Sequence, residues 1–518
     1  MSFTGEVNIP LFSRWVEFNL YGAVKDASHA LCDKHLGATN LRSSSAVYAE
    51  HEDTISAETL PRELKLTARL GAPLALGELG WMSTYIVDAI MIGRMPHAAL
   101  SISASSLGNT IYYALVFCAI GMLRGLETMV AQAYGRNDGR ECLRSLAQSL
   151  WFVILGTPAV MLATLACIPL LGRFGISNEI VTETSRYLHA LIWSTGPLLL
   201  YMALRRYLQA VSRVLLISIS LITANLVNLV GDWAFLYGHL GFHPMGIAGS
   251  GWATGIVRIY MVALLIVGLL LKSGRAKSTF SWALMMPDFA RLRQLAQLGW
   301  PLAIESLTDL GFSTYMSIVC ARLGTTMLAA HQVVLDLDAF VYMVPMGLSY
   351  ATVVRVGQSA GTGSLPAVRR SAKASLVLGM GFISIASLLF AGFPKIWASV
   401  YTNDPAVIAA AAPIFLICGL LQLGDAANVI FCSALIGLGD TRTPMIANSL
   451  IYWAIGAPLS YVLALHSDLA LRGLWIGRGV AAIATGLVMA VVWRVRIRRA
   501  QGSRRPDRVS LLQPMHAK

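Results

Sequence analysis

The string Leu70-Gly71-Ala72-Pro73-Leu74-Ala75 returns later in the chain as Leu298-Gly299-Trp300-Pro301-Leu302-Ala303, so that Gly71 and Gly299 stand 228 residues apart (299 minus 71). Three further landmarks repeat in the same order, at separations of 226 or 227 residues. They are Ala131-Gln132-Ala133-Tyr134-Gly135 with Gly357-Gln358-Ser359-Ala360-Gly361, Arg206-Tyr207-Leu208-Gln209 with Ser433-Ala434-Leu435-Ile436, and Gly246-Ile247 with Gly473-Leu474. One short match would arise by chance, but four matches at a nearly constant separation indicate a duplicated half.

The composition places both halves in a membrane. Of the 518 residues, 56% are hydrophobic and 13% are charged, and the mean hydropathy is +0.63, which is far more apolar than a soluble chain of this length. The apolar residues come in blocks of about 20 or more, the length that crosses a bilayer. We predict spans at 65–92, 105–133, 145–171, 184–207, 213–237, 247–271, 295–320, 329–355, 369–393, 407–433, 443–466 and 472–494.

The predicted fold class is therefore an all-α integral membrane protein with 12 transmembrane helices arranged as two six-helix repeats. An even number of spans per repeat gives both repeats the same orientation, so the repeats are parallel and related by an axis along the membrane normal. This architecture is typical of transporters, in which the substrate path lies where the repeats face each other.

The formal charge of +13 predicts membrane orientation rather than nucleic-acid binding. Lysine and arginine gather in the central loop and after spans 2, 4, 8 and 12, the group after span 4 including Arg205 and Arg206, whereas the alternate connections carry one basic residue or none. By the positive-inside rule, both termini and the central loop are predicted to be cytoplasmic. We divide the chain into a poorly ordered cytoplasmic N-terminal extension (1–63), an N-lobe (64–271), a cytoplasmic interlobe linker (272–294), a C-lobe (295–495) and a basic cytoplasmic tail (496–518).

Polar residues inside the predicted spans of the first half are the first candidates for function. Asp88 lies in span 1, and span 5 carries Asn225, Asn228 and Asp232 at a spacing that places them on one helical face. Together with Thr254 at the start of span 6, the oxygens of Asp88, Asn228 and Asp232 could hold Na⁺ or share a proton between two carboxylates. The alternative is that the asparagines join helices by hydrogen bonds.

The second half carries its own acidic residues. Glu305 and Asp309 share one face of span 7, and Asp425 lies in the middle of span 10. Carboxylates inside a membrane mark function by default, so Glu305 and Asp425 are the leading candidates for ion coupling or substrate binding. Asp336 and Asp338 lie on nearly opposite faces of span 8; we count Asp336 with Asp309 as possible cavity residues, whereas Asp338 could equally face a wet vestibule.

Aromatic and methionine side chains could line a cavity for flat organic cations, although each is more often a packing residue. The candidates are Tyr85, Tyr315 and Met343, and with less weight Tyr112, Tyr113, Tyr342 and Met346.

Other charged residues are more simply structural. We expect Glu78 to cap backbone loosened by Pro73, Arg124 to pair with Glu127, and Arg258 to neutralise a buried carboxylate. His331 is expected near the outer end of its span, in contact with interfacial water.

The sequence carries no Walker loop, no paired-aspartate metal motif and no Ser/His/Asp grouping at a membrane face. The seven cysteines show no metal-binding spacing. We therefore predict neither an enzyme nor a cofactor, and no metal beyond a possible Na⁺ at Asp88, Asn228, Asp232 and Thr254.

Several motifs resemble those of the multidrug and toxic compound extrusion (MATE) family, and the resemblance is closest to its NorM-type branch. It runs from about residue 64 to 495. The matching stretches are Val87–Gly93, Ala131–Gly135, Pro197–Gln209, Asn228–Thr254, "GWPLAIES" (Gly299–Ser306), "AAHQVVL" (Ala329–Leu335), Tyr342–Gly361, "GDTRTPMIAN" (Gly439–Asn448) and "GLWIG" (Gly473–Gly477).

The resemblance implies two six-helix lobes around a V-shaped cavity, and efflux of cationic or amphipathic organic compounds in exchange for inward Na⁺ or H⁺. It implies a multi-pass protein of the cell inner membrane, acting as a monomer. Carried over by position, Asp88, Asn228, Asp232 and Thr254 look like an N-lobe cation site, and Glu305 and Asp425 like coupling or substrate carboxylates of the C-lobe. Arg124, Glu127, Asp336 and Asp338 depart from the family pattern.

Three other functions fit the sequence less well than efflux of organic cations. A lipid-linked saccharide flippase of a related superfamily would not need so many intramembrane carboxylates. A major facilitator would carry a basic motif after span 2 that Gly135–Arg140 matches poorly. A membrane-embedded enzyme would need a group of catalytic side chains at one membrane face, and the sequence shows no such group.

Overall fold

Helices account for almost all of residues 59–95, 98–272 and 285–502, which are the residues that the computed structural model describes. These residues belong to one unit, Ser56–Lys518. Most of the predicted N-terminal extension, the middle of the linker and most of the basic tail lie outside the described residues. The first half contains α3 (Leu60–Ile92), α4 (Ala98–Gly135), α5 (Gly139–Leu171), α6 (Asn178–Ile192), α7 (Thr195–Ala210), α8 (Val214–Phe235) and α9 (Ile247–Lys272), with a 3₁₀ turn at Gly172–Phe174.

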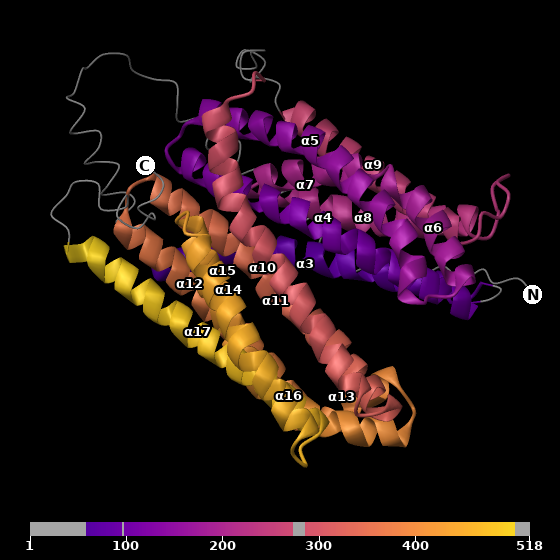
Figure 1. Cartoon of the computed structure of the whole chain (residues 1–518). Helices are drawn as coiled ribbons and strands as arrows, with labels where there is room; N and C mark the ends of the chain where they lie inside the picture. Colours follow the sequence, from indigo (N-terminus) through magenta and orange to yellow (C-terminus); the bar gives the residue numbers. More distant parts are fainter. Residues whose placement is uncertain (1–58, 96–97, 273–284, 503–518) are drawn as a thin grey trace, which may run out of the picture. The chain divides into compact units, whose positions relative to one another are not determined.

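The second half repeats this order. It contains α10 (Phe289–Ala321), α11 (Thr325–Gly361), α12 (Leu365–Gly392), α13 (Pro394–Tyr401), α14 (Pro405–Gly437), α15 (Arg442–Ile451), a π-helical segment η3 (Tyr452–Gly456), α16 (Ala457–Leu465) and α17 (Leu471–Gly502). Every predicted span is found as a helix or a pair of consecutive helices (Figure 1).

Nine helices of the described residues are long and apolar enough to cross a membrane, or ten if the bent pair α6–α7 is one span. The two remaining predicted spans, α3 and α10, are each 33 residues long. Both contain acidic side chains, Glu78 and Asp88 in α3 and Glu305 and Asp309 in α10, which lower their hydropathy. The all-α membrane fold is thus confirmed, while the count of twelve spans stays a prediction.

Two interruptions inside predicted spans follow from proline. The α6–α7 pair bends by 50° near Pro197, which has no N–H to donate to the preceding turn. Pro458 at the start of α16 follows the π-helical segment, where a widened turn accommodates the missing hydrogen bond. This segment begins at Tyr452, whose hydroxyl donates to Asp425 at 3.0 Å.

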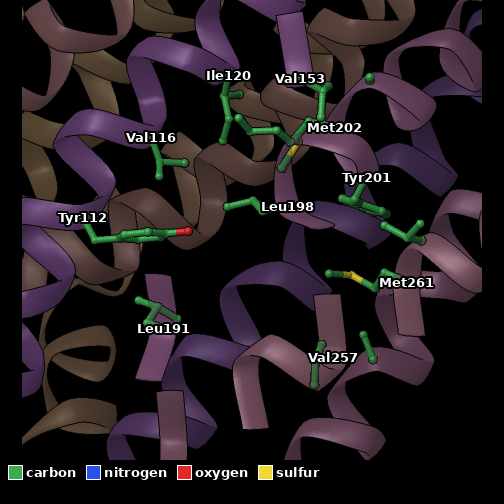
Figure 2. Packing of buried hydrophobic residues seen from close by; sticks show 14 of the residues in the cluster. Tyr112, Val116, Ile120, Val153, Leu191, Leu198, Tyr201, Met202, Val257 and Met261 are labelled. Atoms are coloured by element: carbon green, nitrogen blue, oxygen red, sulfur yellow. The ribbon is translucent and has the colours of Figure 1, made fainter. Parts of the chain in front are cut away.

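Each half encloses its own apolar core. In the first half, helices α4, α6, α7 and α9 bury Tyr112, Leu191, Leu198 and Tyr201 together with their neighbours (Figure 2). In the second half, Trp475 of α17 and Phe415 of α14 are fully buried in the corresponding core. Because the two halves are repeats, each is expected to have its own core, as observed.

The repeated motifs that reveal the duplication meet where the two halves touch. The side-chain amide of Gln132, on α4, donates to the carbonyl oxygen of Gly437 at 2.9 Å. The side-chain amide of Gln358, its counterpart on α11, donates to the carbonyl oxygen of Ala210 at 2.9 Å. Gly437 is the last residue of α14 and Ala210 is the last residue of α7, the helices that end the fourth span of each half, so each glutamine binds the same position of the opposite half.

Glycines allow this close approach. A methyl group on Gly135 would overlap the carbonyl oxygen of Gln358, and one on Gly361 would overlap the carbonyl oxygen of Gln132. These two helix ends can pack this closely only because neither glycine carries a side chain.

Ion pairs in this region differ from the sequence expectations. Glu78 pairs with Arg205 rather than capping backbone, and Glu127 pairs with Arg206 at 3.1 Å rather than with Arg124. Arg205 and Arg206 were expected in the connection after span 4, but they lie within α7 and each is only 3% exposed. A pair of charges is tolerated at such depth because the two partners neutralise each other.

We expect Glu78→Gln to reduce the free energy of unfolding by about 3–5 kcal/mol, since it leaves the Arg205 guanidinium buried without a counter-charge. Glu183→Gln is the matched control, because Glu183 pairs with Arg186 at 2.7 Å on an exposed surface; we expect less than about 1 kcal/mol there. Thermal unfolding of the detergent-purified variants measures both. Equal shifts for the two variants would contradict the structural role of the buried pair.

Candidate ion and substrate sites

The first candidate site joins α3 and α8. Asp232 and Asn228 are fully buried, and the Asn228 amide donates to Asp232 at 3.4 Å. Asp88 of α3 lies near both side chains. The structure therefore brings these three predicted residues together across two helices.

The oxygens of this cluster are incompletely satisfied. One side-chain oxygen each of Asp88, Asn228 and Asp232 is buried and has no hydrogen-bond partner among the described residues. Leaving several buried oxygens unpaired is costly, and a small cation or a shared proton would satisfy them. The arrangement is thus suited to binding Na⁺ or H⁺, as oxygen donors are the preferred ligands of hard cations.

The neighbouring polar residues have other roles. Thr254 on α9 is half-buried, and within the described ranges no hydrogen bond joins it to the cluster. The Asn225 amide donates to the carbonyl oxygen of Gly80 at 2.9 Å, and its own oxygen accepts from Thr84 at 2.9 Å. Asn225 therefore joins α3 to α8, which is the alternative weighed for the asparagines.

Among the described residues, Arg258 makes hydrogen bonds to hydroxyl groups rather than a direct ion pair with the expected carboxylate. Its guanidinium donates to the hydroxyls of Tyr112 and Ser194, each at 2.7 Å, and it forms no ion pair with a carboxylate in the part of the chain that the structure describes. These hydroxyls satisfy the arginine by hydrogen bonds, and the Tyr112 ring lies 5.1 Å from the guanidinium carbon.

The second candidate site is a cavity of about 300 Å³ in the C-lobe, a size suited to a small organic molecule. Helices α10, α11, α14, α15 and α17 supply most of its wall, and Arg124 of α4 reaches it from the other lobe. Its acidic and basic side chains are Glu305, Asp309, Asp338, Asp425, Arg124, Arg478 and His331. Four carboxylates and two arginines leave a formal charge of −2 with His331 neutral.

One end of the cavity is built around Glu305. This carboxylate lies 3.7 Å from Arg124 and accepts from the Asn448 amide at 3.0 Å. Asp309 lies one turn further along α10 and forms no ion pair within the described residues; its side chain is open to the cavity. Asp309 is therefore the carboxylate that is free to meet a ligand cation.

The other carboxylates share one arginine. Arg478 lies 3.1 Å from Asp425 and 3.2 Å from Asp338. Asp425 also accepts from the Tyr452 hydroxyl at 3.0 Å, and Asp338 from the Gln422 amide at 2.7 Å. Asp425 thus lines the cavity as a member of an ion-pair network.

Several residues that the sequence suggested for a cavity do not line this one: Asp336, Tyr85, Tyr315 and Met343. Asp336 instead accepts from the Tyr401 hydroxyl at 2.5 Å and from Gln332 at 2.8 Å. The Tyr315 hydroxyl donates to the carbonyl oxygen of Ala457 at 2.8 Å, and Tyr85 is 57% exposed. Asp336 and Asp338 are two positions apart on α11, so their side chains point to nearly opposite sides of the helix. Of the two, Asp338 lines the cavity.

Sequence reasoning missed several polar residues of this wall. Among them, Arg124 and His331 were assigned other roles, Asn448 was noted only as part of a motif, and Arg478 was not considered. His331 is fully buried rather than near interfacial water. A signal existed on α11, where His331, Leu335, Asp338, Tyr342 and Met346 recur at helical spacing and all line the cavity.

Comparisons with known proteins agree with this architecture. The family model MatE matches the chain twice, at residues 73–234 and 301–462, so each half is recognised separately. "Probable multidrug resistance protein NorM" of Xanthomonas campestris pv. campestris is 32% identical over 461 residues, covering 88% of this chain and 99% of that protein. The protein of the same name from Brucella suis is 28% identical and covers 86% and 95%.

Solved structures share the fold. The Vibrio cholerae MATE transporter VcmN superposes with a TM-score of 0.77 at 18% identity, covering 85% of this chain and 98% of that one. The eukaryotic MATE transporter AtDTX14 gives a TM-score of 0.74 at 18% identity, with the same coverage. The two-repeat fold is thereby confirmed, and this chain belongs to the MATE family, NorM type, as a multi-pass membrane transporter and not an enzyme.

Proposed function

We propose that this protein exports cationic or amphipathic organic compounds across the cell inner membrane in exchange for inward Na⁺ or H⁺. The C-lobe cavity carries the proposal, because it is of small-molecule size and its carboxylates outnumber its arginines. The NorM relatives are named as multidrug resistance proteins, which supports the same class of substrate. We place both termini in the cytoplasm and take the monomer as the working unit.

In this mechanism the two sites do different work. Asp88, Asn228 and Asp232 bind the coupling ion, while the C-lobe cavity binds the exported compound. Binding at either site changes the balance between the inward-open and outward-open states only if that ligand prefers one of them. One positive charge moving inward down a potential of about 100 mV supplies about 2.3 kcal/mol, enough for modest concentration of an uncharged substrate. For a monovalent cation exported in exchange for one ion, the potential cancels and the concentration gradient of the coupling ion drives export.

The coupling test uses purified protein in lipid vesicles loaded with ethidium. An imposed Na⁺ gradient and an imposed pH gradient are compared in separate experiments. We expect ethidium to move against its gradient with one of the two ions. Transport with neither ion, or transport of a lipid-linked saccharide instead, would contradict the proposal.

We expect Asp309→Asn to weaken binding of ethidium about tenfold, since it removes the cavity carboxylate that forms no ion pair. Asp336→Asn is the matched control: it also removes an intramembrane carboxylate, but one outside the cavity, and we expect a change of less than about twofold. Fluorescence titration of the purified variants measures both. Equal losses for the two variants would argue against a cavity role of Asp309.

A further inference from the structure

Three side chains in the wall of the C-lobe cavity contact one another: His331, Trp475 and Arg478. Trp475 of α17 donates its indole N–H to Nδ1 of His331 on α11 at 3.2 Å. The Arg478 guanidinium, one turn along α17, lies over the Trp475 ring at 5.2 Å from its centroid. All three residues line the cavity.

The contact with Trp475 fixes which nitrogen of His331 carries the proton. Because Nδ1 accepts the indole hydrogen, a neutral His331 holds its own hydrogen on Nε2. Nε2 is buried, as is the whole residue, and it has no hydrogen-bond partner among the described residues. Because His331 lines the cavity, the wall contains a buried donor that no described residue uses.

Arg478 contributes a second unused donor. Both of its carboxylate contacts, to Asp338 and Asp425, are made by the nitrogen Nη2. Its other terminal nitrogen, Nη1, is buried and unpaired within the described ranges. A buried donor without a partner is unfavourable, so an acceptor that reaches it gains the full hydrogen bond.

The charges nearby decide what kind of acceptor this can be. Two carboxylates, Asp338 and Asp425, share the single Arg478, so the surroundings carry a net negative charge. A ligand carboxylate would be repelled there, whereas a neutral carbonyl oxygen would not. At the α10 side, Asp309 without an ion pair favours a cation.

From this arrangement we propose that His331 and Arg478 are specificity-determining residues, which select organic cations that also carry a neutral hydrogen-bond acceptor such as an ester or amide carbonyl. The inference rests on the proposed function, since it names the substrate class of the same cavity. Asp309 binds the cationic part of the ligand, and the Nε2 and Nη1 hydrogens of His331 and Arg478 bind the carbonyl.

The test compares two dyes of equal charge. Tetramethylrhodamine methyl ester carries an ester carbonyl on a cationic ring system, and tetramethylrosamine has the same ring system without the ester. We expect the intact protein, purified in detergent, to bind the ester dye about tenfold more tightly than the rosamine, as measured by fluorescence polarisation.

Two variants locate this preference. His331→Phe keeps a ring against Trp475 but removes the donor, and Arg478→Lys keeps the positive charge between Asp338 and Asp425 but removes the guanidinium. We expect either variant to reduce the preference to about twofold or less, because the ester dye loses more affinity than the rosamine. Arg472→Lys, at an exposed position of the same helix, is the control and should keep the full preference.

The outcomes separate the possible failures. Equal binding of the two dyes by the intact protein would overturn the inference, and so would a loss of both dyes together in the variants, since that is the result of a purely structural role. If one variant does not fold, the other still decides the question. Failure of the intact protein to bind either dye would contradict the proposed function itself.

Discussion

Replacing either carboxylate of the N-lobe cluster with asparagine is expected to abolish ion-driven efflux while the protein still inserts in the membrane. Asp88 and Asp232 come from different helices and lie near each other and near Asn228. Asparagine keeps the size of the side chain but can neither carry the charge that attracts Na⁺ nor release a proton. We therefore expect Asp88→Asn and Asp232→Asn to reduce the initial rate of ethidium export on the order of 100-fold.

The measurement is ethidium export from reconstituted vesicles under an imposed gradient of the coupling ion, with the amount of inserted protein determined in parallel. Asp468→Asn serves as the control, since Asp468 is exposed between α16 and α17 and should have no effect. Ethidium binding to the C-lobe cavity should persist in both cluster variants. Full export by Asp88→Asn and Asp232→Asn would exclude this cluster from ion coupling.

The second large effect is expected where the two lobes meet. Gly135→Ala and Gly361→Ala each place a methyl group against a carbonyl oxygen of the opposite lobe, at Gln358 and Gln132 respectively. The helices must move apart, which weakens the hydrogen bonds from the two glutamines. We expect each variant to lose about 1–3 kcal/mol of stability in this state.

A shift of that size changes the balance between transport states by roughly 5- to 150-fold, so export should fall by at least about fivefold in either variant. Gly381→Ala is the matched control, because this glycine lies within α12 and a methyl group there meets no atom within 4 Å. Alanine favours a helix over glycine, so this variant should be as stable as the original or more stable. Thermal unfolding and export assays test all three. If Gly135→Ala and Gly361→Ala behaved like Gly381→Ala, the close contact between the lobes would be unimportant.

The duplicated motifs include two residues that make the contact between the lobes. Gln132 and Gln358 occupy equivalent positions in the two halves, and the structure shows that they make equivalent hydrogen bonds across the interface. In the sequence these motifs were evidence only of duplication, and the structure shows that they lie at the contact between the lobes.

The N-lobe cluster was predictable for a similar reason. Asn228 and Asp232 are four residues apart on one helix, so helical geometry alone places them together. Asp88 required only that α3 pack beside α8. Thr254, by contrast, was assigned from its place at the start of span 6 and from the resemblance, and on α9 it makes no hydrogen bond to the cluster within the described residues.

Charged partners on different helices were the least predictable feature. Arg124 and Glu127 are three residues apart and were expected to pair, yet Arg124 lies beside Glu305 and Glu127 beside Arg206. Between packed helices, the partner of a buried charge depends on which neighbouring helix faces it. Spacing along one helix cannot reveal this.

Hydropathy, helical period and the internal repeat were sufficient for the membrane class, the two lobes and the N-lobe carboxylates, because each depends on residues close together in the chain or on their average polarity. The wall of the C-lobe cavity depended on packing between helices far apart in the chain. Asp338 rather than Asp336 faces the cavity, and Arg478 reaches Asp338 and Asp425 from the last helix. Those pairings follow from how five helices rotate and pack around one space, and no periodicity within a single helix contains that information.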